Sequence, residues 1–205
     1  MGRAFRPGGF SDAGGAQEMG EMGVVPAEAQ AVLDFWFRET EPEKWFKRDD
    51  AFDATVRARF ADLHARATAG DCDGWAATPR GCLALVVLLD QFPRNMFRGE
   101  PPSFATDAAA CALTKLALDR GFDADLSLRE KQFLYMPLQH SEDAADQAMS
   151  VERNGATGDA ELLKYAEAHK RIVDRFGRFP HRNDVLGRAT TPEEAGFLAQ
   201  PGSSF

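Results

Sequence analysis

An unbroken apolar run over residues 83–89 constrains the fold of this 205-residue chain more than any other feature. Thr78 and Pro79 precede the run, and this pair is typical of a helix N-cap followed by the first helical residue. Pro93 follows it and predicts that the helix ends near Gln91. A buried β-strand is the other interpretation, but the chain offers no second strand-like segment for pairing. Because the run is apolar on all sides, we expect a helix at the centre of a core.

Helix signals recur along the rest of the chain. Apolar residues follow a three-to-four spacing through residues 49–69, and Gly70 is a plausible helix stop. Ser127 and Glu130 match the capping-box pattern. Further helices are expected over residues 26–38, 103–120, 127–136, 141–153, 159–176 and 191–199. Seven to nine helices with short links predict an all-α fold, in which antiparallel helix pairs stack as an α-α array.

The two ends of the chain differ in composition. Residues 1–24 are rich in Gly, Ala and Glu and show no hydrophobic period, which predicts a disordered leader. Residues 25–205 have the length of one ordinary domain, so we expect a single helical domain there.

Charge and cysteine usage exclude several classes of function. The net charge of −8 argues against a broad basic face for nucleic acid and against docking on anionic membranes. No stretch reaches the 18 apolar residues of a membrane span. The three cysteines form no CxxC pair, which indicates reduced thiols and a cytoplasmic location. They are Cys72, Cys82 and Cys111.

Three polar segments beside apolar residues, all near helix ends, are candidate functional sites. The first consists of Asp90-Gln91-Phe92-Pro93-Arg94-Asn95, at the end of the most apolar helix. A carboxylate there must be partly buried, and a buried carboxylate needs a partner. Arg94 or a more distant arginine would supply it. A purely structural Asp–Arg pair is the alternative. The candidate ligand-binding residues of this segment are Asp90, Gln91, Arg94 and Asn95.

The second segment consists of Met136-Pro137-Leu138-Gln139-His140-Ser141-Glu142-Asp143. Ser141 is a natural N-cap, and the two acids suit the positive end of the next helix. That explains the acids but not His140. A histidine beside two carboxylates has a raised pKa and can act as an acid or a base. The candidate catalytic residues here are His140, Glu142 and Asp143.

The third segment consists of Phe176-Gly177-Arg178-Phe179-Pro180-His181-Arg182-Asn183. The Phe-Pro pair forces an extended or turn geometry, so the residues after it lie on a loop and can point into a cleft. His181 is a further catalytic candidate, and Arg182 and Asn183 are ligand-binding candidates. In the alternative interpretation, Arg182 pairs with an acid of a neighbouring helix in a rigid turn.

No segment matches a nucleotide-binding loop, a metalloprotease helix or a nucleophile elbow. The histidines and acids of the last two segments include metal-ligand types, but no pair shows HxxxH or HxH spacing. The sequence therefore predicts no metal and no organic cofactor.

These segments resemble the bacterial DUF924 family of uncharacterised proteins, and the resemblance covers about residues 28–199. Phe35-Trp36-Phe37 fits it too, as do Leu186-Gly187-Arg188 and Thr191-Pro192-Glu193-Glu194. The resemblance implies a tetratricopeptide-like α-α superhelix. It implies no activity, ligand or catalytic residue.

Three hypotheses about function follow. In the first, the segments converge on one cleft, where Arg94 and Arg182 clamp a small anionic molecule. His140 and His181 are then the acid–base groups of an enzyme that carries out hydrolysis or proton transfer. In the second, the chain is a scaffold that binds a peptide or protein through a groove, with Trp45, Trp75 or surface Phe side chains as anchors. In the third, the polar segments only pair with one another and specify helix packing.

Overall fold

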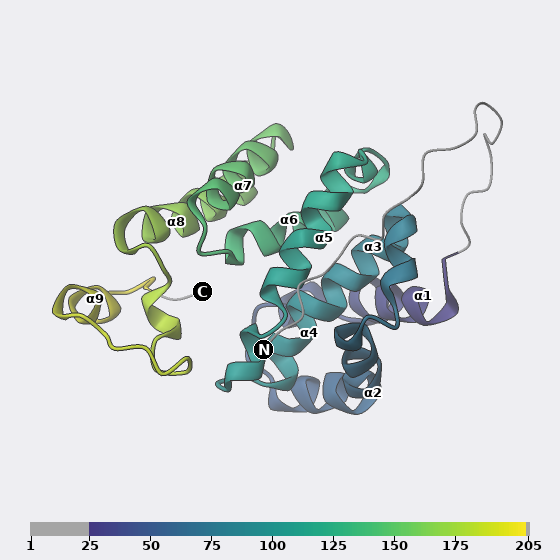
Figure 1. Ribbon diagram of the computed structural model, residues 1–205, viewed down its shortest axis with the longest axis horizontal. Helices are drawn as coiled ribbons and strands as arrows, with labels where there is room; N and C mark the ends of the chain where they lie inside the picture. Colours follow the sequence, from purple (N-terminus) through teal and green to yellow (C-terminus); the bar gives the residue numbers. More distant parts are fainter. Residues whose placement is uncertain (1–24, 204–205) are drawn as a thin grey trace.

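The computed structural model describes residues 25–203, which form nine α-helices joined by short 3-10 and π segments, with no β-strand among them (Figure 1). The all-α prediction is therefore confirmed. The predicted leader, residues 1–24, lies outside the described residues. The helices are α1 (Ala27–Asp34), α2 (Asp50–Ala69), α3 (Pro79–Val86), α4 (Phe92–Met96), α5 (Asp107–Asp119), α6 (Leu128–His140), α7 (Ala144–Ala156), α8 (Ala160–Phe176) and α9 (Pro192–Leu198).

The helices begin where the sequence places capping residues. The Thr78 side chain accepts a hydrogen bond from the Gly81 N–H at the start of α3. Ser127 and Glu130 form the predicted capping box of α6. Gly70 ends α2 in the left-handed region, with a φ of 95° that only glycine adopts without strain. No described helix is both long and apolar enough to cross a membrane.

An aromatic core fills the part of the molecule built from α1 to α6. Every residue of the run 83–89 is buried, which confirms its central place. The rings of Phe92 and Phe133 both meet Trp36 edge-on, with ring centroids 5.6 and 5.4 Å away. Trp45 and Trp75, considered as anchors for a partner, are buried in this same core.

The helix that carries Asp90 does not end at Gln91, contrary to the prediction. It passes through a π segment (Val87–Gln91) and continues as α4. Pro93 has no N–H for the Leu89 carbonyl four residues earlier, and the Thr106 hydroxyl donates to that carbonyl instead. Because another donor replaces the missing one, the proline does not stop the helix. Pro137 likewise lies inside α6.

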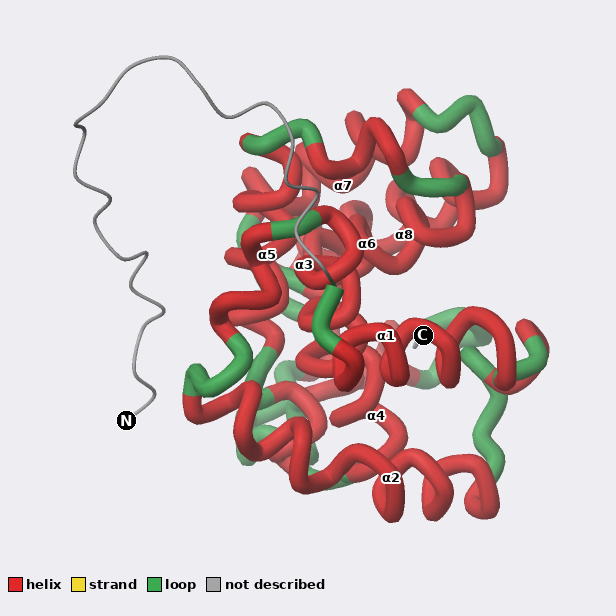
Figure 2. Tube along the Cα trace, turned by 90° about the vertical axis from the view of Figure 1, so that its right-hand side faces the viewer, coloured by secondary structure: helices red, strands yellow, loops and turns green. Residues whose placement is uncertain are grey.

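The C-terminal part of the molecule, built from α7 to α9, buries a different kind of side chain. The helices α5 to α8 pack as consecutive neighbours, and Figures 1 and 2 place α7 and α8 at the end of the molecule opposite α2. The fully or nearly buried residues of α7 are all polar. They are Asp146, Gln147, Ser150 and Asn154. Among the described residues, the apolar cluster of this part has three buried members, Ile172, Val173 and Phe179.

Candidate functional site

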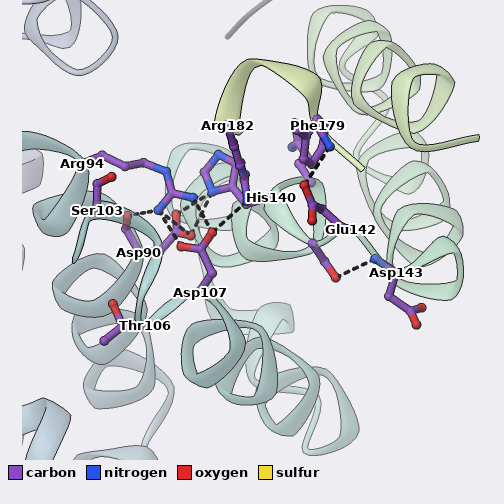
Figure 3. A network of polar contacts seen from close by, with 12 residues as sticks. Asp90, Arg94, Ser103, Thr106, Asp107, His140, Glu142, Asp143, Phe179 and Arg182 are labelled. Carbon is purple, nitrogen blue, oxygen red and sulfur yellow. Dashed lines mark hydrogen bonds and ion pairs between the residues drawn. The ribbon is translucent and has the colours of Figure 1, made fainter. Parts of the chain in front are cut away.

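A buried aspartate and a histidine form the centre of the site. Asp90 lies in the π segment, and its side chain has no exposed surface. His140 is the last residue of α6, and its Nδ1 lies 2.8 and 3.0 Å from the two carboxylate oxygens of Asp90 (Figure 3). An ionised carboxylate only accepts hydrogen bonds, so Nδ1 carries the proton and donates. In the neutral ring, Nε2 then has a free lone pair.

The charge states of this pair follow from its surroundings. Burial alone would raise the pKa of Asp90, but the charges of Arg94 and His140 outweigh it and hold that pKa well below its usual value. Burial, assisted by the Arg94 charge, lowers the pKa of His140 to about 4. The pair is therefore an ionised carboxylate beside a neutral imidazole near pH 7.

The predicted upward shift of the His140 pKa is wrong. It assumed that Glu142 and Asp143, the acids next in sequence, face the ring. Both carboxylates bind other groups instead, and the acid that does face the ring is Asp90. Burial and Arg94 then decide the direction.

Two arginines meet at a second acid of the site, Asp107, the first residue of α5. Nη1 and Nη2 of Arg94 lie 2.9 and 3.0 Å from its two oxygens, and Nη1 of Arg182 lies 3.2 Å from one of them (Figure 3). The Arg182 guanidinium also lies 4.7 Å from the ring centroids of both Phe104 and Phe179. Charge pairing and stacking together fix its plane.

Beside these groups lies a hollow of about 520 Å³, which we call the α5–α6 hollow. Its wall consists of Pro101, Phe104, Ala105, Asp107, Ala108, Cys111, Ala112, Lys115, His140, Ser141, Glu142, Asp146, Arg182 and Leu186. Nε2 of His140 and Nη2 of Arg182 have no hydrogen-bond partner among the described residues. The wall thus combines an available acceptor, an available donor and apolar surface.

The three polar segments therefore meet. Asp90 and Arg94 come from the first, His140 from the second and Arg182 from the third. Gln91 is buried behind them and donates from Nε2 to Asp90. His181 lies nearby, with its ring centroid 5.7 Å from that of Phe179, but it is not part of the hollow's wall. Burial, assisted by Arg182, lowers its pKa to about 4.

Four other candidates have structural partners. Glu142, in the link between α6 and α7, accepts two hydrogen bonds from the Arg188 guanidinium and one from the Phe179 N–H, and so ties this link to the segment between α8 and α9. Asp143 is the N-cap of α7 and accepts from two backbone N–H groups. The remaining two are Asn95, bonded to Asp53, and Asn183, bonded to Thr190, Arg188 and Glu194.

Sequence reasoning missed two parts of the site. Asp107 stands in the first turn of a helix, where the helix dipole already explains an acid, so nothing singled it out. Asp146 accepts from the Cys111 thiol at 3.2 Å and the Ser141 hydroxyl at 2.8 Å, and pairs with Lys115. Cys111 and Lys115 lie on α5, Ser141 follows α6 and Asp146 lies on α7, so helix packing brings the four together and no single spacing in the sequence connects them. Within the described residues, no group of three or more His, Cys, Asp or Glu side chains could hold a metal ion.

Residues 32–202 match the family model described as a bacterial protein of unknown function, DUF924. The chain belongs to the DUF924 family. A solved structure of a protein of unknown function from Agrobacterium tumefaciens is similar to this DUF924 member, with 44% sequence identity and a TM-score of 0.81. The similarity covers 84% of this chain and 97% of that one. No curated protein matches the chain.

Proposed function

We propose that this DUF924 member binds a small anionic molecule in the α5–α6 hollow and uses His140 as an acid–base group in hydrolysis or proton transfer. The observation that supports this most is the setting of His140. Asp90 holds its Nδ1, the ring lines the hollow, and Nε2 has no partner among the described residues.

The Asp90–His140 pair has the arrangement that general acid–base catalysis needs. The buried carboxylate fixes the ring orientation and the tautomer, and it stabilises an imidazolium that forms during a reaction. Nε2 can then exchange a proton with water or a bound molecule. A covalent intermediate receives less support. The Ser141 hydroxyl and the Cys111 thiol both donate to Asp146, and burial raises the pKa of that thiol to about 12. We therefore favour direct activation of water or of the bound molecule.

Arg182 is the group best placed to recognise an anion. Its side chain is only 8% exposed, it lines the hollow, and Nη2 is available for a charge-assisted hydrogen bond. Arg94, in contrast, gives both of its terminal nitrogens to Asp107 and donates to the Asp90 carbonyl. We therefore assign Arg94 a positioning role. Phe104 and Leu186, which line the hollow, would contact the apolar part of the ligand.

The test of binding is a thermal-shift screen of the full chain with trifluoroacetate, benzoate and inorganic phosphate. A ligand at 100 times its Kd adds about 2.7 kcal/mol of stability. We expect at least one anion to raise Tm, and we expect Arg182→Lys to lose most of the shift, because lysine keeps the charge but not the planar fork. Arg38→Lys is the matched control, at a side chain that is 73% exposed and pairs with Asp34. Equal shifts in both variants would contradict the role of Arg182, and no shift with any anion would contradict the binding itself.

The test of acid–base chemistry uses p-nitrophenyl acetate and p-nitrophenyl phosphate as probe substrates. We expect His140→Gln to lower turnover by about 10²-fold or more, the usual contribution of a positioned acid–base group. His64→Gln is the control, at a histidine buried against Phe97 in the aromatic core. If His140→Gln kept the turnover of the unsubstituted chain, His140 would take no part in the reaction. Peptide or protein binding stays a prediction, as do the expected absences of nucleic-acid and membrane partners.

A further inference from the structure

The charges around the α5–α6 hollow neutralise one another. Among the described residues, four carboxylates and four cations stand on or directly behind its wall, each in contact with an opposite charge. They are Asp90 and Asp107 with Arg94 and Arg182, Glu142 with Arg188, and Asp146 with Lys115. With His140 neutral, this site has no net charge to attract an anion.

A monoanion that enters the hollow would therefore add an uncompensated negative charge in a partly buried place. Such a charge is costly unless a partner balances it. The balancing charge has to come from a group that can become positive close to neutral pH. Lys115 and Arg182 are positive already, and His140 is the histidine on the wall.

His140 is neutral near pH 7 and lies between charges of opposite sign on the elements packed around it. The charged and titratable groups that face it are Asp90, Arg94 on α4, Asp107 on α5, His169 on α8, and His181 and Arg182 on the turn Pro180–Arg182. Arg94 opposes a proton on the ring, and the two carboxylates favour one. A further negative charge within about 4 Å of Nε2 shifts the balance towards the imidazolium.

We propose that anion binding protonates His140, so that each anion enters the hollow together with one proton from solvent. This inference rests on the proposed function and deepens it. In the complex, Nε2 carries a proton and His140 starts the reaction as a general acid. It gives that proton to the bound molecule, this transfer returns the ring to its neutral form, and the protonated product then leaves.

The experiment measures the Kd of trifluoroacetate for the full chain by ¹⁹F NMR as a function of pH. This anion stays ionised throughout the range, so any proton taken up must come to the protein. If one proton enters with each anion, Kd should weaken about tenfold per pH unit between pH 5 and 6.5. The tenfold slope extends only up to the pKa of His140 in the complex, so ¹⁵N-histidine spectra should show this pKa rising from about 4 to about 7 or above at saturation. The His140→Gln spectrum assigns the resonance.

Two variants separate this inference from the proposed function. The Kd of His140→Gln should lose its pH dependence, while His64→Gln should keep it. A pH-independent Kd in the unsubstituted chain, with binding still lost in Arg182→Lys, would overturn proton uptake and leave the anion site intact. Absence of trifluoroacetate binding at every pH would overturn the site for small monoanions and the inference with it.

Discussion

The part of the molecule built from α1 to α6 and the part built from α7 to α9 bury different kinds of side chain. The first encloses stacked and edge-on aromatic rings in one large apolar cluster. The second buries polar groups on α7, and the described part of its own apolar cluster has three buried residues. The stability gained by burying apolar surface does not depend on pH, whereas the contribution of a buried titratable group does. The candidate site lies where the two parts meet, so it combines a rigid frame with charges whose state can change.

The largest effect should come from the aromatic part. Phe92→Ala removes a fully buried ring that contacts Phe35, Trp36 and Phe60. We expect a loss of about 3–5 kcal/mol in the free energy of unfolding, because the cavity cannot close around so many rigid rings. Urea denaturation followed by circular dichroism measures it.

Phe197→Ala is the comparison in the other part. Phe197 is only partly buried and packs against Phe176, with ring centroids 5.1 Å apart. It should cost clearly less than Phe92→Ala. Equal losses for the two variants would mean that the C-terminal part depends on its small apolar cluster as strongly as the first part depends on its rings.

The sequence predicted the aromatic part better than the polar part, and the reason is physical. Helix caps and apolar spacing are local signals, so Thr78 correctly marked a helix start, Gly70 a helix end, and the run 83–89 a buried helix. Convergence of the three polar segments on one cleft was what one of three hypotheses predicted, and the sequence alone did not decide among them. Which partner each group finds depends on the packing of distant helices. Glu142 could not be assigned to Arg188, nor Asp107 to two arginines, from any spacing in the chain.

A smaller effect per side chain should follow from pH, mainly in the polar part and at the site beside it. Burial is the largest cause that lowers the pKa of His140, His169 and His181 from 6.5 to about 4 each. Between these values the unfolded chain binds protons that the folded chain does not, so stability falls as the pH falls. Above pH 6.5 the stabilisation is fully present. By pH 5 each histidine should have cost up to about 1–2 kcal/mol.

Hydrogen exchange at pH 7 and pH 5, corrected for intrinsic rates, locates this effect. Amides of α8 and of the turn at Pro180 should lose protection first, while those of α3 keep theirs. His181→Gln should reduce the loss, since one proton-binding group is removed from the unfolded chain. Simultaneous loss of protection in α3 and α8 would show that the two parts unfold as one unit and that the contrast between them has no thermodynamic meaning.

The smallest effect should come from substitutions of Asp143, which test whether this residue holds the ligand or only caps α7. Its carboxylate accepts from the N–H groups of Ala145 and Asp146 at the start of α7, and these bonds turn it away from His140. Asp143→Ala should therefore cost about 1 kcal/mol, the usual value of an N-cap, and Asp143→Ser should restore most of it. Neither variant should change the Kd of trifluoroacetate or the turnover of a probe substrate, because the lone pairs of this carboxylate satisfy a helix end. If Asp143→Ala instead lost as much binding as Arg182→Lys, Asp143 would be one of the groups that hold the ligand. The start of α7 would then be part of the binding site.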